Sequence, residues 1–116
     1  MLKFYHYAKC QTCVKAKRFL TGKKYLLKEI DITSFPPNAL ELKDLIKKSG
    51  QPYTAFLNRS GIQYREKNMK EKIKKLTEDE IIEILSKDGR LIKRPIVTDG
   101  KKVTVGFKEE EFESKW

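Results

Sequence analysis

Cys10 and Cys13 are the residues of this chain whose type and spacing could do chemistry, and they are its only two cysteines. A strand-like apolar segment precedes them and a helix-like segment follows, so Cys10 is predicted to begin a helix. A thiol there faces unpaired backbone amides and the positive end of the helix dipole, which stabilise thiolate over thiol. Cys13 lies in the same turn, so Cys10 could attack a disulfide and Cys13 could attack the resulting adduct.

The immediate neighbours of the pair extend this prediction. Lys9 adds positive charge that favours a thiolate, and we take Lys9 and Thr12 as candidate binding residues. Two alternatives are a metal site and two incidental cysteines, one of them packed in the helix. A structural zinc site needs about four ligands, whereas the chain offers two cysteines and His6. We therefore expect no metal and interpret His6 as a packed or edge-strand residue.

Composition limits the class of protein. The 116 residues predict one domain, 1–116, with a compact core. The net charge of +10 favours acidic partners: nucleic acid, an acidic protein surface or an anionic small substrate. The sequence shows no signal peptide. Its apolar runs are shorter than the ~20 residues of a spanning helix, so we expect a soluble, cytoplasmic protein. Paired cysteines in the cytosol are more often redox-active or metal-binding than structural.

The predicted elements place the dithiol between a strand at 2–7 and a helix at 11–21 that Gly22 would end. A second strand at 26–32 completes a parallel βαβ unit. A helical insertion at about 34–88 follows, interpreted as part of the same domain. Its first helix would end at Gly50, and its apolar stripe would consist of Leu40, Leu42, Leu45 and Ile46.

The end of the insertion and the last third of the chain give further signals. Thr77 and Glu80 form a capping box before a helix. Asp99-Gly100 is a hairpin turn that leads into a strand at 102–107, and a final helix is predicted at 108–116. The order β-α-β, helical insertion, β-β-α indicates an α/β protein with a thioredoxin-like fold.

Arg94-Pro95 is the second candidate feature of the site. In a thioredoxin-like order, the proline before the third strand is usually cis and faces the active cysteine, which makes Pro95 a candidate binding residue. Arg94 is the third candidate catalytic residue, because its guanidinium could stabilise a thiolate or bind an oxyanion in a bidentate manner. The alternative is an ordinary surface arginine in a chain rich in basic residues.

Four segments of the sequence form a set: Cys10-x-x-Cys13-x-Lys15-Ala16, Asn58-x-Ser60-Gly61-x-x-Tyr64-Arg65-Glu66, Lys93-Arg94-Pro95-Ile96-Val97 and Val105-Gly106-Phe107-Lys108. Together they resemble the arsenate-reductase-like family, in the branch shared with Spx- and MgsR-type regulators. The resemblance covers essentially the whole chain and implies a thioredoxin-like fold with a helical insertion.

In true arsenate reductases of this type, one cysteine forms an adduct with arsenate and glutathione, and three arginines hold the oxyanion. Cys10 matches that cysteine and Arg94 matches one arginine. Thr54 stands where we align the second arginine, and the third falls within 105–107, which holds none. Each missing charge-assisted hydrogen bond removes on the order of 1.5–3 kcal/mol. Cys13 replaces the usual serine, so the resemblance implies a dithiol cycle, with arsenate reduction as the weaker alternative.

The regulator branch implies a different use of the same pair. There the C-x-x-C disulfide is a redox switch, and the protein binds the C-terminal domain of the RNA polymerase α subunit. Cys10 and Cys13 would be the switch and Arg94 its responder. Gly50 is either a partner contact of that branch or a plain helix stop. The basic run 67–75 lacks aromatic residues, so we interpret it as a solvated helical face and expect no direct nucleic-acid binding.

The sequence therefore predicts a thiol–disulfide oxidoreductase that needs no metal or organic cofactor. Thioredoxin or a low-molecular-weight thiol would be its reductant. The alternative is a redox-sensing regulator that binds the RNA polymerase α subunit.

Overall fold

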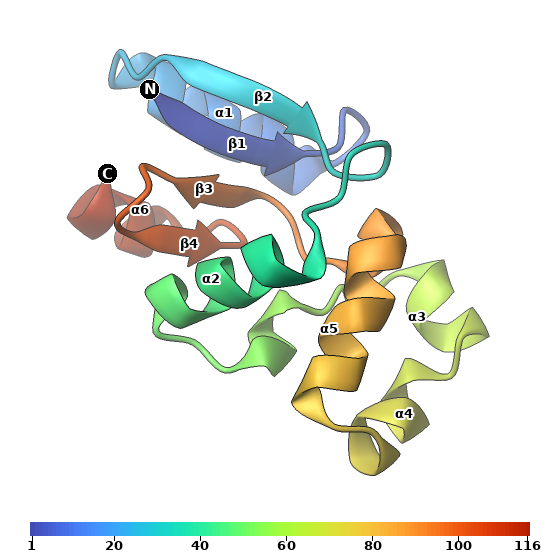
Figure 1. The fold of residues 1–116 in the computed structure, drawn as a ribbon. Coiled ribbons are helices and arrows are strands. Elements are labelled where there is room, and N and C mark those ends of the chain that lie inside the picture. Colours follow the sequence, from blue (N-terminus) through green and yellow to red (C-terminus); the bar gives the residue numbers. More distant parts are fainter.

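A four-stranded sheet organises the protein in the computed structural model, which describes residues 1–116 (Figure 1). The strands are β1 (Leu2–His6), β2 (Leu27–Asp31), β3 (Ile96–Thr98) and β4 (Val103–Val105). Their spatial order is β2-β1-β3-β4. β1 runs parallel to β2, and β3 runs antiparallel to both β1 and β4. The chain thus returns from the insertion to place β3 directly beside β1.

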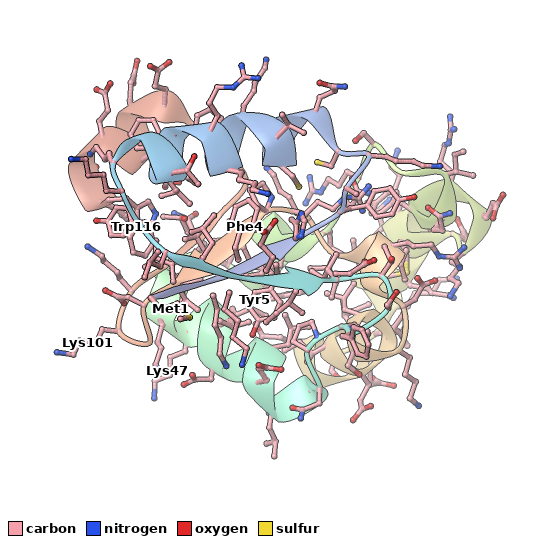
Figure 2. All side chains as sticks on the ribbon, turned by 90° about the horizontal axis from the view of Figure 1, so that it is seen from above. Met1, Phe4, Tyr5, Lys47, Lys101 and Trp116 are labelled. Carbon is pink, nitrogen blue, oxygen red and sulfur yellow. The ribbon has the colours of Figure 1, made fainter.

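Helices cover both faces of this sheet, as Figure 2 shows from above. α1 (Gln11–Gly22) and α6 (Glu109–Lys115) share one buried cluster with Leu2 and Phe4 of β1. Tyr5 points to the opposite face, where α2 (Ala39–Ser49) packs. Successive side chains of a strand point to opposite faces, so β1 contributes to both layers of core. Cys13 belongs to the α1 side of this arrangement.

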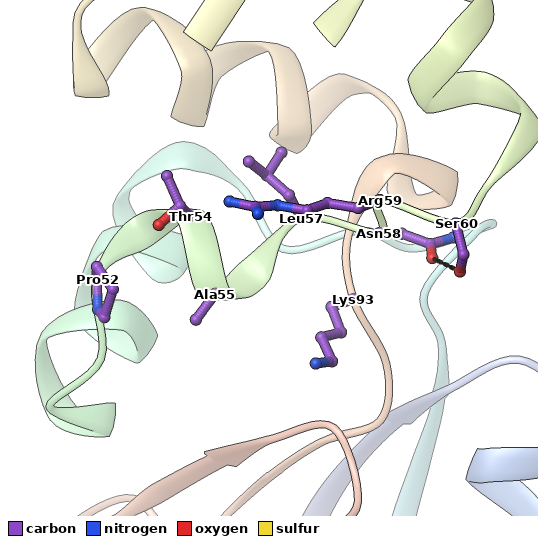
Figure 3. A pocket seen from close by; sticks show the side chains of 8 residues that line it. All are labelled: Pro52, Thr54, Ala55, Leu57, Asn58, Arg59, Ser60 and Lys93. Atoms are coloured by element: carbon purple, nitrogen blue, oxygen red, sulfur yellow. Dashed lines mark hydrogen bonds between the residues drawn. The ribbon is translucent and has the colours of Figure 1, made fainter. Parts of the chain in front are cut away.

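The insertion between β2 and β3 contains, besides α2, the helices α3 (Ile62–Glu66), α4 (Met69–Lys75) and α5 (Glu78–Lys87). After α2, residues 52–60 pass beside Lys93, which stands before β3 (Figure 3). The Lys93 backbone amide donates to the Phe56 carbonyl oxygen over 2.7 Å. The insertion is thereby attached to the segment that carries Arg94-Pro95.

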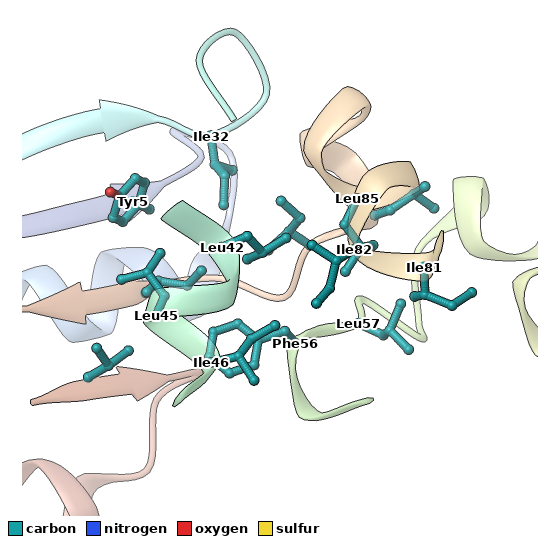
Figure 4. Packing of buried hydrophobic residues seen from close by; sticks show 14 of the residues in the cluster. Tyr5, Ile32, Leu42, Leu45, Ile46, Phe56, Leu57, Ile81, Ile82 and Leu85 are labelled. Carbon is teal, nitrogen blue, oxygen red and sulfur yellow. The ribbon is translucent and has the colours of Figure 1, made fainter. Parts of the chain in front are cut away.

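A buried hydrophobic cluster joins α2 and α5 to the sheet (Figure 4). Leu42, Leu45 and Ile46 of α2 meet Ile82 and Leu85 of α5 in this cluster. Their positions repeat at three- and four-residue spacing, so they occupy one face of each helix. The sheet contributes Tyr5, Ile96 and Val103.

The predicted fold class and element order are confirmed, with one local correction. The first helix ends at Gly22, within one residue of the prediction, and the left-handed conformation that follows it falls on Lys24 (φ 67°). Leu40 is not part of the apolar stripe and is 80% exposed. It precedes Leu42 by two positions, which is more than half a turn around the helix. α3 was not predicted from the sequence.

Helix ends follow the predicted capping signals. Gly50 ends α2 in the left-handed conformation, with φ 70°. The Glu80 amide donates to the Thr77 hydroxyl over 3.2 Å, and the Thr77 amide donates to the Glu80 carboxylate over 3.0 Å. This capping box satisfies two amides that an uncapped helix would leave unpaired. No helix of the protein is long and apolar enough to cross a membrane.

Asp88 fixes the turn from α5 toward β3, and its replacement tests that role. It is 9% exposed, and its carboxylate accepts hydrogen bonds from Arg90 at 3.0 and 3.1 Å and from Lys67 at 2.8 Å. Hydrogen bonding from Arg90 is the main cause that holds the Asp88 pKa well below its usual range. A lowered carboxyl pKa adds stability above the unfolded-state value and loses it as the pH falls.

We expect Asp88→Asn to lower the free energy of unfolding at pH 7 by about 1–3 kcal/mol, because the charge-assisted bonds are lost. The deficit should shrink as the pH falls below 4, because the Asp88 carboxyl of the unfolded wild type is then protonated while that of the folded protein is still ionised. Urea unfolding at pH 7 and at a pH below 4 measures the difference in unfolding free energy between the variant and the wild type. Asp44→Asn is the control, because Asp44 pairs only with Lys48 on the surface and should change stability by less than about 0.5 kcal/mol. Equal effects of both variants would contradict the assignment.

Candidate active site

Cys10 stands at the junction of β1 and α1 as the N-cap residue of the helix. Its backbone is extended, with φ −93° and ψ 114°, and its Sγ accepts a hydrogen bond from the Cys13 amide over 3.3 Å. A sulfur in this position occupies the place of a capping oxygen, so the helix itself supplies the donor. The same donor would stabilise negative charge on Sγ. Cys10 is half-buried, which leaves its sulfur open to a substrate.

Cys13 lies beneath this position and is 2% exposed. Burial and its hydrogen bond with Cys10 raise the pKa of the Cys13 thiol to about 12. The Tyr7 backbone and the positive charge of Arg94 act in the opposite direction. At neutral pH Cys13 is therefore a protonated thiol in the reduced protein. The two cysteines are both free, and they differ in access, because Cys10 is half-buried and Cys13 is buried.

Arg94 and Pro95 come back to the dithiol from the far end of the sequence. The Arg94–Pro95 peptide bond is cis, as predicted, and the Pro95 carbonyl accepts from the Gly106 amide over 2.8 Å. The Arg94 guanidinium lies over the Tyr7 ring, 5.1 Å from its centroid. A cation held against an aromatic face keeps a defined direction. Arg94 and Cys10 line the same cavity, as the sequence interpretation requires.

The cavity that Cys10 and Arg94 both line, here called the catalytic cavity after the role we propose below, has a volume of about 380 Å³. Of the predicted site residues, Cys10, Thr12 and Arg94 line it. Cys13 and Pro95 are buried and Lys9 is exposed, and none of the three lines the cavity. The other lining residues were not predicted as site residues: Asn58, Ser60, Lys93, Val105, Gly106, Phe107 and Lys108. All of them fall within the segments that carried the family resemblance, which was the only signal available for them.

One arginine and two lysines supply the positive charge that lines the cavity containing Cys10. Residues 105–107 line the catalytic cavity and contribute no arginine. Thr54 does not line it, and belongs to an adjoining cavity. Lys93 and Lys108 supply the remaining positive charge around Cys10. Lysine binds anions as a point charge and does not form the bidentate pairs of arginine.

Backbone pairing holds the insertion against the segment that carries Arg94-Pro95. The Asn58 amide donates to the Leu91 carbonyl over 2.8 Å, and Leu57 forms an isolated antiparallel bridge with Ile92. Because these bonds fix residues 57–58 beside 91–93, Asn58 and Ser60 reach the cavity that contains Cys10. The insertion therefore forms one wall of the candidate site.

His6 is a structural residue of β1 and lies outside this cavity. Its ring centroid is 5.2 Å from that of Phe4, and its Nε2 is 3.5 Å from the Glu29 carboxylate. No group of three or more His, Cys, Asp or Glu side chains is placed to hold a metal ion. β1 is an inner strand of the sheet, so His6 is packed and does not lie on an edge strand.

The difference between the two thiols gives a direct test of the geometry. In the folded, reduced protein at pH 8, we expect iodoacetamide to modify Cys10 and to leave Cys13 unmodified, because Cys13 is buried and protonated. Mass spectrometry of the peptides measures this. Unfolding in guanidinium should make both cysteines reactive. Equal labelling rates in the folded protein would contradict the arrangement.

Comparison with known proteins gives matches over almost the whole chain. The ArsC family model matches residues 5–114. The uncharacterized protein YusI of Bacillus subtilis is 53% identical over 115 residues, which cover 99% of this chain and 98% of YusI. The regulatory protein MgsR of B. subtilis is 28% identical, over 91% of this chain and 82% of MgsR. The global transcriptional regulator Spx of Enterococcus faecalis is 29% identical, over 96% of this chain and 83% of Spx.

Solved structures of similar proteins also superpose on almost the whole chain. An ArsC family related protein from Bacteroides fragilis superposes with a TM-score of 0.93 and 39% identity, covering 97% of this chain and 95% of the other. A possible arsenate reductase from Streptococcus mutans UA159 gives a TM-score of 0.87 and 36% identity, covering 97% and 98%. The similarity thus includes the insertion as well as the sheet.

Proposed function

The chain belongs to the ArsC family, and we propose that it acts in the cytoplasm as a thiol–disulfide oxidoreductase of this family. Cys10 is the nucleophile, and Cys13 is the resolving cysteine. The observation that carries the proposal is the position of Cys10, whose Sγ caps α1 through the Cys13 amide and opens into the cavity that Arg94 lines. A helix N-terminus and a nearby cation both favour the thiolate that attacks a disulfide.

The proposed reaction has two exchange steps. The Cys10 thiolate bonds to one sulfur of the substrate disulfide, and the other substrate sulfur leaves as a thiolate. Cys13 gives its proton to solvent and attacks Cys10 Sγ, which releases the second substrate thiolate. The substrate gains two electrons, and the protein retains a Cys10–Cys13 disulfide. Thioredoxin or a low-molecular-weight thiol then returns two electrons to the protein.

The causes of the raised Cys13 pKa support this order of events. Burial is the largest cause of the rise and persists in a mixed disulfide, whereas the hydrogen bond with Cys10 and the charge on Cys10 also raise the pKa. These two smaller causes disappear when Cys10 is bound in a mixed disulfide, and the lowering effect of Arg94 remains. The Cys13 pKa should therefore fall at the resolving step, in the direction that the reaction needs. Arg94 serves the resolving step in this scheme, besides favouring the Cys10 thiolate.

The proposal is tested by turnover with a neutral disulfide. The reduced protein is mixed with bis(2-hydroxyethyl) disulfide, and product thiols and protein mass are followed with time. We expect two product thiols per protein and a loss of two mass units, as the Cys10–Cys13 disulfide forms. Thioredoxin with its reductase and NADPH should then restore the dithiol and support repeated cycles. A protein that retains both thiols with excess disulfide would refute the enzymatic function.

A redox-sensing regulator is the second candidate, favoured by the similarity to MgsR and Spx. In that case the same disulfide changes a binding surface and turns over no substrate. Immobilised protein would be presented with the RNA polymerase α subunit in the reduced form and in the oxidised form. Binding in one redox state only would support the regulator. The absence of binding in both states would leave the oxidoreductase.

A further inference from the structure

Two cavities adjoin at the candidate site and form one groove. The catalytic cavity shares Asn58, Ser60 and Lys93 with a second cavity of about 430 Å³. The second cavity continues along the insertion, where its other lining residues are Pro52, Thr54, Ala55, Leu57 and Arg59. In Figure 3, the Arg59 side chain runs back along this segment toward Thr54, and Lys93 lies on the side that faces the strands. The groove thus leads away from Cys10 along the insertion.

The groove carries positive charge and no negative charge. Arg59, Lys93, Arg94 and Lys108 line it, and no Asp or Glu side chain lines either cavity. None of the four cations forms a salt bridge within the protein, whereas Lys17, Lys43, Lys48, Lys67, Lys74 and Arg90 do. Four unpaired cations in one groove repel each other, and an anionic occupant would relieve that repulsion.

Lys93 lies at the junction of the two cavities. Its backbone is held by the hydrogen bond to Phe56, and its side chain lies over Gly106, which has φ 77°. A Cβ at Gly106 would come within 2.9 Å of Lys93 Cε. Glycine at this position therefore leaves room for the Lys93 side chain to lie between the catalytic cavity and its extension. The arrangement makes the cationic lining continuous from Arg94 to Arg59.

We propose that this groove binds an acidic peptide strand that flanks the substrate disulfide. The inference rests on the proposed function and names its substrate class. A single small anion would occupy only one of the two cavities, whereas a peptide can place its cysteine at Cys10 and a carboxylate beside Lys93 and Arg59. Single-stranded nucleic acid is disfavoured, because Phe107 is the only aromatic residue in the groove and base binding uses stacking platforms.

Two measurements test this with matched peptides. Each peptide contains one intramolecular disulfide flanked by glutamates, by glutamines or by lysines, and serine analogues report binding without chemistry. At low salt we expect the glutamate peptide to be reduced about tenfold faster than the lysine peptide, and its serine analogue to bind more tightly. The preference should fade in 1 M salt, where the screening length is about 3 Å.

Arg59→Glu with Lys93→Gln should remove the preference for glutamate over lysine peptides. Lys101→Glu, on the β3–β4 turn outside the groove, is the control and should retain it. The inference is overturned if the double variant retains the preference. It is equally overturned if the double variant reduces all three peptides more slowly than the wild type by the same factor. It is also overturned if the small anion dithiodiglycolate is reduced as fast as the glutamate peptide.

The experiment separates the groove from the chemistry. If no disulfide is reduced but the glutamate serine analogue still binds through Arg59 and Lys93, the oxidoreductase proposal fails and the groove retains its ligand class. If all disulfides are reduced without regard to charge and the serine analogues bind equally, the groove assignment fails and the oxidoreductase proposal stands.

Discussion

Replacing Cys10 with serine is expected to reduce disulfide reduction to the uncatalysed background, the largest effect on activity that we predict. A serine hydroxyl retains the capping hydrogen bond from the Cys13 amide, so α1 should begin at the same residue. The hydroxyl does not ionise near neutral pH and cannot attack a disulfide as a thiolate does. The rate of product thiol release from bis(2-hydroxyethyl) disulfide measures the loss, and the thermal unfolding midpoint shows that the fold is retained.

Cys13→Ser is the matched variant, because it removes the second exchange step and leaves the first. We expect it to form a stable mixed disulfide at Cys10, seen as a mass increase of one substrate thiol, and to release one product thiol where the wild type releases two. If Cys13→Ser turns over like the wild type, or if Cys10→Ser remains active, the assigned roles are wrong. Cys13 is buried, so the stability of this variant is measured beside its activity.

Gly89→Ala is expected to destabilise the protein at least as much as Asp88→Asn. Gly89 begins the 3-10 turn Gly89–Leu91 between α5 and β3, and it lies against the end of β2. A Cβ at this position would stand 1.8 Å from the Ile32 carbonyl oxygen and 2.7 Å from its carbon, both of them backbone atoms. Backbone cannot swing aside as a side chain can, so the two segments must separate. We expect a loss of about 1–3 kcal/mol or more in the free energy of unfolding.

Gly22→Ala is the control for that substitution. Gly22 is the last residue of α1, its φ is not positive, and no atom lies within 4 Å of a Cβ built there. Alanine is a better helix former than glycine, so this variant should be unchanged or up to about 1 kcal/mol more stable. Urea unfolding compares both variants with the wild type. A Gly89→Ala midpoint equal to that of the wild type would show that the close approach to Ile32 is absent.

Local signals account for the parts of the fold that the sequence predicted. The dithiol between a strand and a helix, the capping box at Thr77 and the helix stop at Gly50 each depend on residues a few positions apart. The order of strands and helices follows from such signals, because periodicity and caps act within one element. Leu40 was assigned to the wrong face of its helix, because packing against the rest of the protein decides which face a helix buries.

The composition of the candidate site depended on long-range contacts. Lys93 and Lys108 stand far from Cys10 in the sequence, and only the family resemblance, not a local pattern, distinguishes them from the other lysines of the chain. Lys9, next to Cys10 in the sequence, lies outside the cavity. Proximity in sequence was therefore a poor guide to which cations surround the sulfur.

The sequence by itself determined that Cys10 and Cys13 are close together at a helix N-terminus, and the order of elements around them, because these depend on neighbouring residues. Only the tertiary structure decided that Asn58, Ser60 and Lys93 join Cys10 in one groove. The reason is the backbone pairing of residues 57–58 with 91–92, which brings the insertion against the segment before β3. That contact closes a loop of more than thirty residues, and no local pattern encodes its outcome.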